Sequence, residues 1–238
     1  TDADDNVAIG ALALSGDTLG SQSVAIGRGA LKVQNFTTAT STYNVAVGYS
    51  AGELVTTGTQ NTLIGGLAGD ALTDADGNVA VGYASLTDNV LGSNSVAIGR
   101  NALNAQNPAT ATDMYNVAVG NNCGEAITTG THNTLVGGLV GDALTTGFAN
   151  VAVGGGATYA ALGSDTKGKF STAIGFGALR SQNFTTETAT NNTAVGYFAG
   201  GTVSTGIQNT YIGALAGDDC NDGNNNTAVG YLALSANC

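Results

Sequence analysis

Apolar and polar residues alternate in one short phrase that returns along the whole chain. The phrase is Asn-Val-Ala-Ile-Gly or a close variant, and it occurs thirteen times. A repeat of about twenty residues is typical of a small unit stacked many times on itself. We therefore expect one continuous solenoid domain over residues 1–238. The spacing between successive phrase glycines is 17 or 21 residues, and these glycines are Gly10, Gly27, Gly48, Gly65, Gly82, Gly99, Gly120, Gly137, Gly154, Gly175, Gly196, Gly213 and Gly230.

Each coil is numbered here from the Asn or Ser that opens its phrase. Positions 2 to 4 alternate and predict a short strand, because successive side chains of a strand point to opposite faces. Position 2 is Val or Thr and position 4 is Val or Ile, and we expect this β-branched pair to fill the coil interior. Gly at position 5 suits a turn with positive φ or a close backbone approach. Asn at position 1 suits the preceding turn and a hydrogen-bonded ladder between stacked coils.

The coil length excludes an alternating strand and helix architecture, because a βαβ unit takes roughly 30 residues. The sequence therefore predicts an all-β parallel β-solenoid of about 13 coils, each of 17 or 21 residues. The coils follow a four-coil superrepeat, copied about three times. Its second coil carries a longer loop that opens with Gln-Asn, at residues 34–43, 106–115 and 182–191.

Composition narrows the class of function. Apolar residues make up 42% of the chain, and its 37 Gly lack a third-residue period, so neither disorder nor a collagen helix fits. The net charge of -11 disfavours nucleic acid and anionic membrane surfaces as partners. No stretch approaches 18 apolar residues, so we expect no membrane insertion. The chain begins with Thr1, which indicates a processed product or an excised fragment.

Several phrases resemble two related repeat families. Residues 192–197 (Asn-Thr-Ala-Val-Gly-Tyr) and 226–234 look like the repeats of phage and virus tail-fibre proteins. Residues 23–27 and 95–99 (Ser-Val-Ala-Ile-Gly) are similar to the head repeats of trimeric autotransporter adhesins. The adhesin repeat is shorter, so the spacing here fits the fibre type better. The resemblance implies a trimer of left-handed β-rolls that binds cell surfaces or matrix, in an extracellular, virion or cell-surface location.

Position 3 provides a candidate assembly face. It is Ala in ten coils, and so small a stripe, on the face expected to lie opposite the core, would let the backbones of subunits approach closely. The larger residues at this position, one in each four-coil block, would then plug the axis of the oligomer. The predicted assembly face consists of Ala8, Ala25, Ala46, Leu63, Ala80, Ala97, Ala118, Leu135, Ala152, Ala173, Ala194, Tyr211 and Ala228.

The longer loops are the candidate binding surface, because loops on a rigid scaffold commonly carry recognition. Repetition of one weak site would give multivalent binding to a surface glycan or matrix polymer. The alternative is that these loops cover neighbouring subunits. Tyr residues at position 6, such as Tyr197, are expected to be packing residues, with sugar stacking as the alternative. The predicted binding residues are Asn35, Phe36, Thr37, Thr38, Asn107, Asn183, Phe184 and Thr185.

A second class of function is a monomeric ice-binding or other ligand-binding solenoid. Thr alternates in two of the longer loops, and flat Thr arrays on solenoids bind ice. Against this interpretation, the array recurs only in every fourth coil, so adjacent coils do not share it. The residues are Thr38, Thr40 and Thr42, with Thr186, Thr188 and Thr190 in the third block.

Candidate chemistry is sparse. His132 is the only His, and no constellation of acid, base and nucleophile appears, so we expect no enzyme. The turn with Asp74 and Asp76 has the oxygen ligands that calcium prefers, but it also reads as an ordinary solvated turn, so no cofactor is expected. Cys220 and Cys238 fall at neighbouring positions of stacked coils, within disulfide reach. Cys123 replaces a small residue and is expected to be a buried free thiol.

Overall fold

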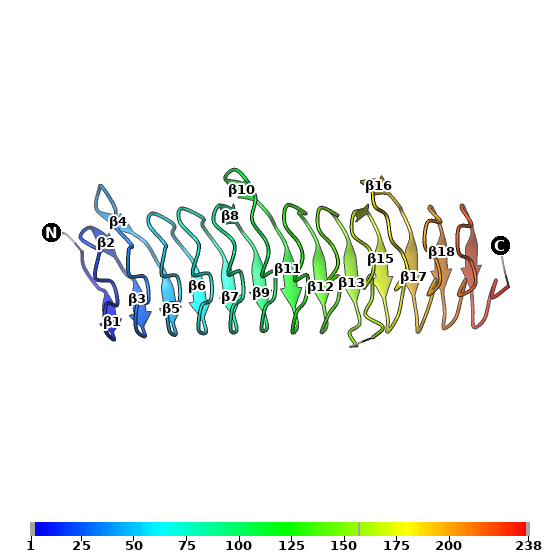
Figure 1. Cartoon of the computed structure of the whole chain (residues 1–238), viewed down its shortest axis with the longest axis horizontal. Coiled ribbons are helices and arrows are strands. Elements are labelled where there is room, and N and C mark those ends of the chain that lie inside the picture. The colour runs from blue at the N-terminus through cyan, green and yellow to red at the C-terminus, as the bar shows by residue number, and fades with distance from the viewer. Residues whose placement is uncertain (1–2, 157, 237–238) are drawn as a thin grey trace. The chain divides into compact units, whose positions relative to one another are not determined.

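The described residues of the computed structural model, 3–156 and 158–236, are all-β and contain no helix. About thirteen parallel stacked coils form a β-solenoid, which confirms the predicted fold class (Figure 1). The chain divides into two compact units, Thr1–Tyr115 and Asn116–Cys238, called unit 1 and unit 2 below. In the part of the chain that the structure describes, no helical segment has the length and apolarity needed to cross a bilayer.

Unit 1 contains a parallel sheet of three-residue strands in the order β1-β3-β5-β6-β7-β9 and two parallel pairs of two-residue strands, β2-β4 and β8-β10. Like residues lie on like residues: Val7 pairs with Val24, and Val24 pairs with Val45. The strands are β1 (Val7–Ile9), β2 (Gly20–Ser21), β3 (Val24–Ile26), β4 (Thr40–Ser41), β5 (Val45–Val47), β6 (Thr62–Ile64), β7 (Val79–Val81), β8 (Gly92–Ser93), β9 (Val96–Ile98) and β10 (Thr112–Asp113).

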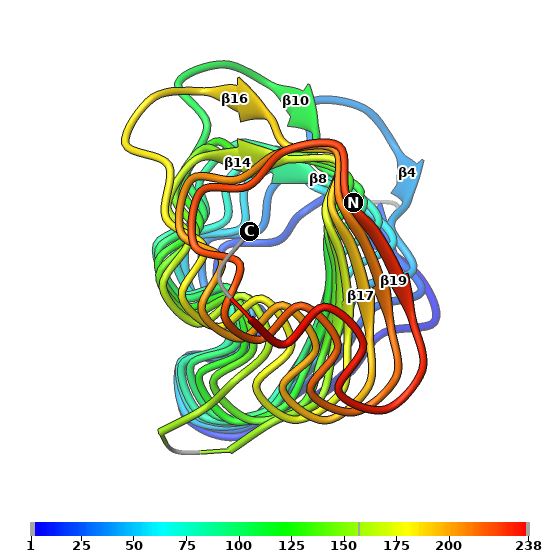
Figure 2. The same cartoon turned by 90° about the vertical axis from the view of Figure 1, so that its right-hand side faces the viewer.

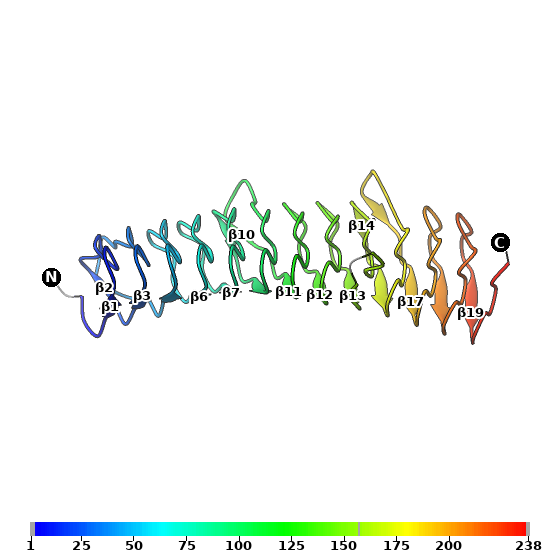
Figure 3. The same ribbon diagram turned by 60° about the horizontal axis from the view of Figure 1, so that its bottom comes forward.

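Unit 2 repeats the arrangement, with the order β11-β12-β13-β15-β17-β18-β19 and one short pair, β14-β16. Figure 3 shows these strands as successive arrows along the unit. The strands are β11 (Val117–Val119), β12 (Thr134–Val136), β13 (Val151–Val153), β14 (Gly168–Lys169), β15 (Thr172–Ile174), β16 (Thr188–Ala189), β17 (Thr193–Val195), β18 (Thr210–Ile212) and β19 (Thr227–Val229).

The predicted Asn ladder forms inside both units. In unit 1 the Asn61 Oδ1 accepts a hydrogen bond from the Asn78 backbone N at 2.9 Å, and the Asn61 Nδ2 donates to the Ala75 carbonyl at 2.8 Å. In unit 2 the Asn192 Oδ1 accepts from the Asn209 backbone N at 2.9 Å. Each of these buried amides therefore joins its own coil to the next one, so burying it leaves no unpaired polar group.

Both reasons for Gly at position 5 are confirmed. Gly213 has a φ of 130°, and a Cβ built on it would lie 2.5 Å from the carbonyl oxygen of Gly230 in the next coil. Gly230 has a similar φ of 124°, but nothing lies within 4 Å of its Cβ position. Positive φ and close approach of the next coil are thus two separate reasons for glycine. Gly213 is subject to both, and Gly230 only to the first.

The predicted assembly face is wrong, because position 3 points into the coil rather than away from it. Most of its side chains are fully buried within the single chain, and Ala228 is 4% exposed. Ala8 is exposed because its coil is the first of unit 1. A buried side chain cannot offer a surface to a partner. The residues that line the interior instead are Ala25, Ala46, Leu63, Ala80, Ala97, Ala118, Leu135, Ala152, Ala173, Ala194, Tyr211 and Ala228.

Position 9, on the wall of the coil opposite position 3, explains why Ala at position 3 faces the interior. Where position 3 is Ala80, position 9 is Leu86, which is also fully buried and fills the interior. Where position 3 is Leu63, position 9 is Gly69, and a Cβ there would lie 2.8 Å from the Leu63 Cδ2. In these two coils a large residue occupies one wall and a small one the other, whereas Ala46 is paired with Gly52 and the Leu63 side chain of the next coil fills that space. The same compensation appears in unit 2, where Tyr211 is matched by Gly217.

Candidate functional site

Positions 2 and 4 form an outer sheet face, defined as the first and third residues of each three-residue strand. Position 3 points inward, so these β-branched side chains lie on the outward side of the sheet. They are partly exposed: Ile64 by 39% in unit 1, and Ile174 by 38% and Ile212 by 41% in unit 2. Contiguous apolar surface of this kind usually marks an interaction site. Each unit therefore presents a narrow, regular apolar strip.

One part of the strip in unit 2 is chemically distinct. Thr172 pairs with Thr193, Thr193 with Thr210, and Thr210 with Thr227, so four Thr side chains stand in register at position 2. This ladder runs through adjacent coils, unlike the Thr residues of the long loops, which recur only in every fourth coil. The loops themselves do not provide it, because Thr42 and Thr190 are fully buried.

The longer loops extend beyond the outline of the other coils, with β4 and β10 in unit 1 and β16 in unit 2 (Figure 2). Their Phe residues are not presented for binding: Phe36 and Phe184 are each only 8% exposed. That part of the prediction is wrong, because each ring packs inward under its loop. The other predicted binding residues are exposed, namely Asn35, Thr37, Thr38, Asn107, Asn183 and Thr185.

A buried polar network holds the base of each longer loop. The Gln34 Nε2 donates to the Ser23 Oγ at 2.9 Å, and the Gln34 Oε1 accepts from the Asn44 Nδ2 at 2.8 Å. The Gln182 Nε2 donates to the Ser171 Oγ at 2.8 Å in the third block. Where Ser replaces Asn at position 1, the Gln side chain thus supplies hydrogen bonds that the Asn side chain makes in the other coils. The opening Gln of each loop signature is a structural residue.

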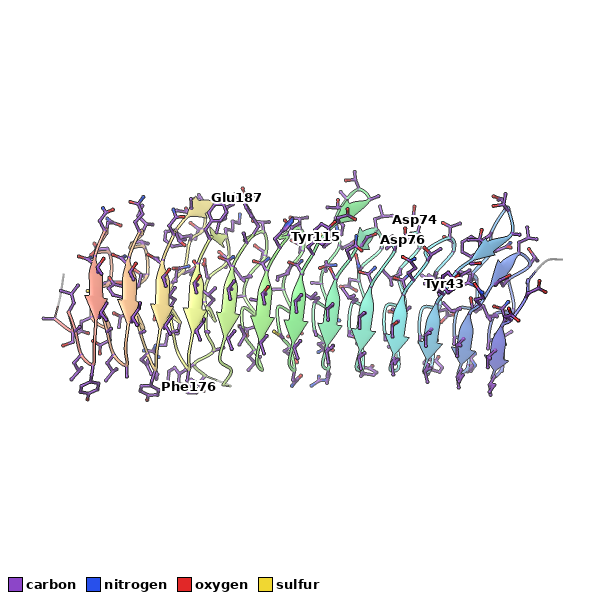
Figure 4. The ribbon with its side chains drawn as sticks, turned by 180° about the vertical axis from the view of Figure 1, so that it is seen from behind. Tyr43, Asp74, Asp76, Tyr115, Phe176 and Glu187 are labelled. Carbon is purple, nitrogen blue, oxygen red and sulfur yellow. The ribbon has the colours of Figure 1, made fainter. Side chains whose placement is uncertain are left out.

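The carboxylates considered for calcium have protein partners. The Asp76 Oδ1 accepts hydrogen bonds from the Thr59 backbone N at 2.6 Å and the Thr59 Oγ1 at 3.0 Å. The Asp74 Oδ1 accepts from the Thr73 Oγ1 at 3.0 Å. Among the described residues, no group of three or more His, Cys, Asp or Glu side chains is placed to hold a metal ion. Figure 4 labels both carboxylates on the outside of unit 1.

The cysteine prediction is confirmed in one part. Cys123 is a buried free thiol, and burial raises its pKa to about 12. Cys220 is also buried. Its predicted partner Cys238 lies outside the described residues, so their pairing stays a prediction. His132 lies exposed in its turn.

Unit 2 contains a cavity at the place where the chain departs from its regular repeat. The cavity has a volume of 210 Å³ and lies beside the four extra residues of the ninth coil. Three hydroxyl side chains, one carboxylate and one guanidinium contribute to its wall. Burial is the main cause that raises the pKa of the Asp142 carboxyl, and Glu125 adds to it. The lining residues are Leu139, Asp142, Gly156, Thr158, Ala160, Gly163, Ser164, Arg180 and Ser181.

The regular repeat does not predict this cavity. Its signal was the irregular coil that begins at Asn150, whose extra residues interrupt the repeat.

Comparison with family models, with curated proteins and with solved structures finds no match to the chain.

Proposed function

We propose that the chain is a non-catalytic, adhesive segment of an extracellular, virion or cell-surface fibre. In this proposal its left-handed coils of 17 or 21 residues assemble as a trimer. The outer sheet face carries the proposal, because it is a regular apolar surface that the single chain leaves partly exposed. Side chains of this kind stabilise association when a second copy covers them.

Covering the outer sheet face contributes free energy of the order that assembly requires. Burying an exposed Val or Ile side chain contributes roughly 1.5–3 kcal/mol, so covering the exposed part of each contributes about 0.5–1 kcal/mol. Association costs an estimated ~4–15 kcal/mol. About ten such residues on each copy contribute about 5–10 kcal/mol, which is of the same order as that cost. The choice of three copies comes from the sequence resemblance, and the face supplies the surface that such a trimer needs.

Charge variants of the outer sheet face test the proposal. Ile174→Asp introduces a carboxylate at a 38% exposed position of the strip, while Thr185→Asp places the same charge on an exposed loop. We expect Ile174→Asp to dissociate the assembly in sedimentation velocity, with its circular dichroism unchanged. Thr185→Asp should sediment like the parent chain. Equal sedimentation of both variants and the parent would show that the face makes no subunit contact.

The partner proposed for the fibre is a surface glycan or matrix polymer, bound weakly at many repeated places. The exposed loop residues, Asn35, Thr37, Asn183 and Thr185 among them, are available for such contacts. Thr37→Ala with Thr185→Ala should reduce adhesion to the partner surface without changing the mass of the assembly. Undiminished adhesion would remove the loops from the binding surface.

The Thr ladder of unit 2 favours a second candidate, a monomeric ice-binding protein. Stacked strands space its members by about 4.8 Å, and regular arrays of methyl and hydroxyl groups suit an ice surface. Thermal hysteresis of the purified chain tests this candidate. Hysteresis that Thr193→Lys abolishes would support it, and its absence from the parent chain would eliminate it.

A further inference from the structure

The guanidinium of Arg180 lies at the wall of the unit 2 cavity and forms no ion pair with a described residue, although the Asp142 carboxylate also lines this cavity. Its carbon lies 4.7 Å from the ring centre of Tyr159 and 4.9 Å from that of Phe198, so the cation is held by two aromatic rings. Its Nε is buried and has no hydrogen-bond partner. Among the described residues, neither ion pair involves Arg180.

The equivalent position in the first four-coil block carries an ion pair that Arg180 does not form. There position 10 is Lys32, whose Nζ forms an ion pair with the Glu53 Oε1 at 2.9 Å, from position 10 of the next coil. In the third block the same two positions are Arg180 and Gly201. The carboxylate has therefore been replaced by glycine while the cation has been kept. Arg180 therefore lacks the partner that Lys32 has in the next coil, and its guanidinium can pair with an anion from outside the chain.

The remaining wall suits a hydroxylated ligand. Thr158, Ser164 and Ser181 supply hydroxyl groups that donate and accept, and the Asp142 carboxylate accepts hydrogen bonds. The volume of 210 Å³ is below the roughly 300–1,000 Å³ of ordinary small-molecule pockets. One small unit, about the size of a single sugar ring, is the occupant that this space fits.

An aromatic patch adjoins the cavity. Tyr159, Phe176, Tyr197 and Phe198 contact one another in sequence, and the Phe176 and Tyr197 rings stack with an angle of 9° at 5.9 Å. Phe176 is 38% exposed and Tyr197 is 55% exposed. In Figure 4, Phe176 lies at the opposite end of the unit 2 coils from Glu187. The apolar faces of sugar rings stack on exposed aromatic rings of this kind.

We propose that this cavity binds the carboxylated terminal sugar of a surface glycan, with Arg180 holding the carboxylate. Asp142 and the three hydroxyls contact the sugar hydroxyls, and the exposed aromatic rings support the next ring of the glycan. The planar guanidinium matches a carboxylate with two parallel hydrogen bonds. The net charge of -11 repels a long polyanion, so the ligand is one acidic end unit. This inference rests on the adhesive function proposed above and supplies its ligand class.

Saturation-transfer NMR with soluble sugars tests the inference on the intact chain. Glucuronate and N-acetylneuraminate are the two carboxylated probes, and they distinguish a uronate from a nonulosonate source. Glucose and the methyl ester of glucuronate are the neutral probes. We expect at least one carboxylated probe to bind about tenfold or more tightly than the neutral ones, because a charge-assisted pair is lost. Equal binding of the acid and its ester by the parent chain would overturn the proposal.

A matched pair of variants locates the site. Arg180→Gln should reduce binding of the acidic sugar by about tenfold or more. Lys32→Gln, at the equivalent position of unit 1, should leave it unchanged, because Lys32 already pairs with Glu53. If Arg180→Gln fails to fold, the comparison of glucuronate with its methyl ester on the parent chain still tests whether the carboxylate is recognised. Displacement of the sugar by equimolar acetate would overturn its assignment to a sugar. If the parent chain forms the trimer but binds neither acidic sugar, this inference alone is refuted, and if the parent chain binds the sugar as a monomer, only the trimer is refuted.

Discussion

Interior packing makes a quantitative prediction for Gly52 and Leu63 of unit 1. A Cβ on Gly52 would lie 2.7 Å from the Leu63 Cδ1, and Leu63 is fully buried. Gly52→Ala should cost about 1–2 kcal/mol for its φ of 59° and about 1–3 kcal/mol more for overpacking. Leu63→Ala should cost about 3–5 kcal/mol through the cavity that it leaves. In the double variant the added methyl group enters that cavity, so the clash with Leu63 disappears and the approach to the Leu31 Cδ2 at 3.0 Å remains.

We therefore expect the double variant to be more stable than the sum of its parts by at least about 1 kcal/mol. Urea unfolding followed by circular dichroism measures the four free energies of unfolding. Gly29→Ala is the matched control, since Gly29 has a φ of 73° and its Cβ would meet nothing closer than 3.5 Å. It should cost only about 1–2 kcal/mol and should not couple to Leu63→Ala. Additive losses for Gly52 and Leu63 would refute the assignment of both residues to one interior.

Three further outcomes follow from single sites. Gly213→Ala should destabilise unit 2 by about 1–3 kcal/mol more than Gly230→Ala, because only the former meets a stacked carbonyl; equal losses in urea unfolding would contradict the stacking. Burial raises the pKa of Asp70 to about 6, so its protonated form favours folding and stability falls as the pH rises from about 4 to 7. Asp70→Asn should then stabilise the chain by about 1 kcal/mol at pH 8, after solvent screening, and hardly at all at pH 4; an equal effect at both pH values would exclude this cause. Non-reducing peptide mapping should recover Cys220 joined to Cys238, and separate recovery would exclude the bond.

The period of the repeat predicts the strands, their parallel stacking, the Asn ladder and the strict glycine at position 5. It does not predict which side of a three-residue strand faces inward, because alternation looks the same from either face. Choosing the larger, β-branched pair for the interior ignored the opposite wall of the coil. The signal was present in the sequence: Leu63, Leu135 and Tyr211 are each followed six residues later by Gly, at Gly69, Gly141 and Gly217. Compensation of this kind indicates that both positions share one interior.

The long loops show a different limit. Phe36 was predicted to be a binding residue but is nearly buried, and Gln34, which opens the shared loop signature, is fully buried. The repeated signature instead maintains a polar network that closes the coil where Ser23 replaces Asn. The unit 2 cavity lies beside a single insertion, and the cation in its wall, Arg180, has glycine at Gly201 where the first block has a carboxylate. Features that occur once leave no periodic signal, so only the folded arrangement brings their residues together.

The solution mass of the unmodified chain tests the central claim most directly. The outer sheet face has to be covered by other copies if it serves assembly, whereas an ice-binding or other solitary solenoid keeps it free. Light scattering at several concentrations should give about 70 kDa, three times the 23.3 kDa chain, without dissociation on dilution to the micromolar range. A mass of 23.3 kDa at every concentration would contradict the account.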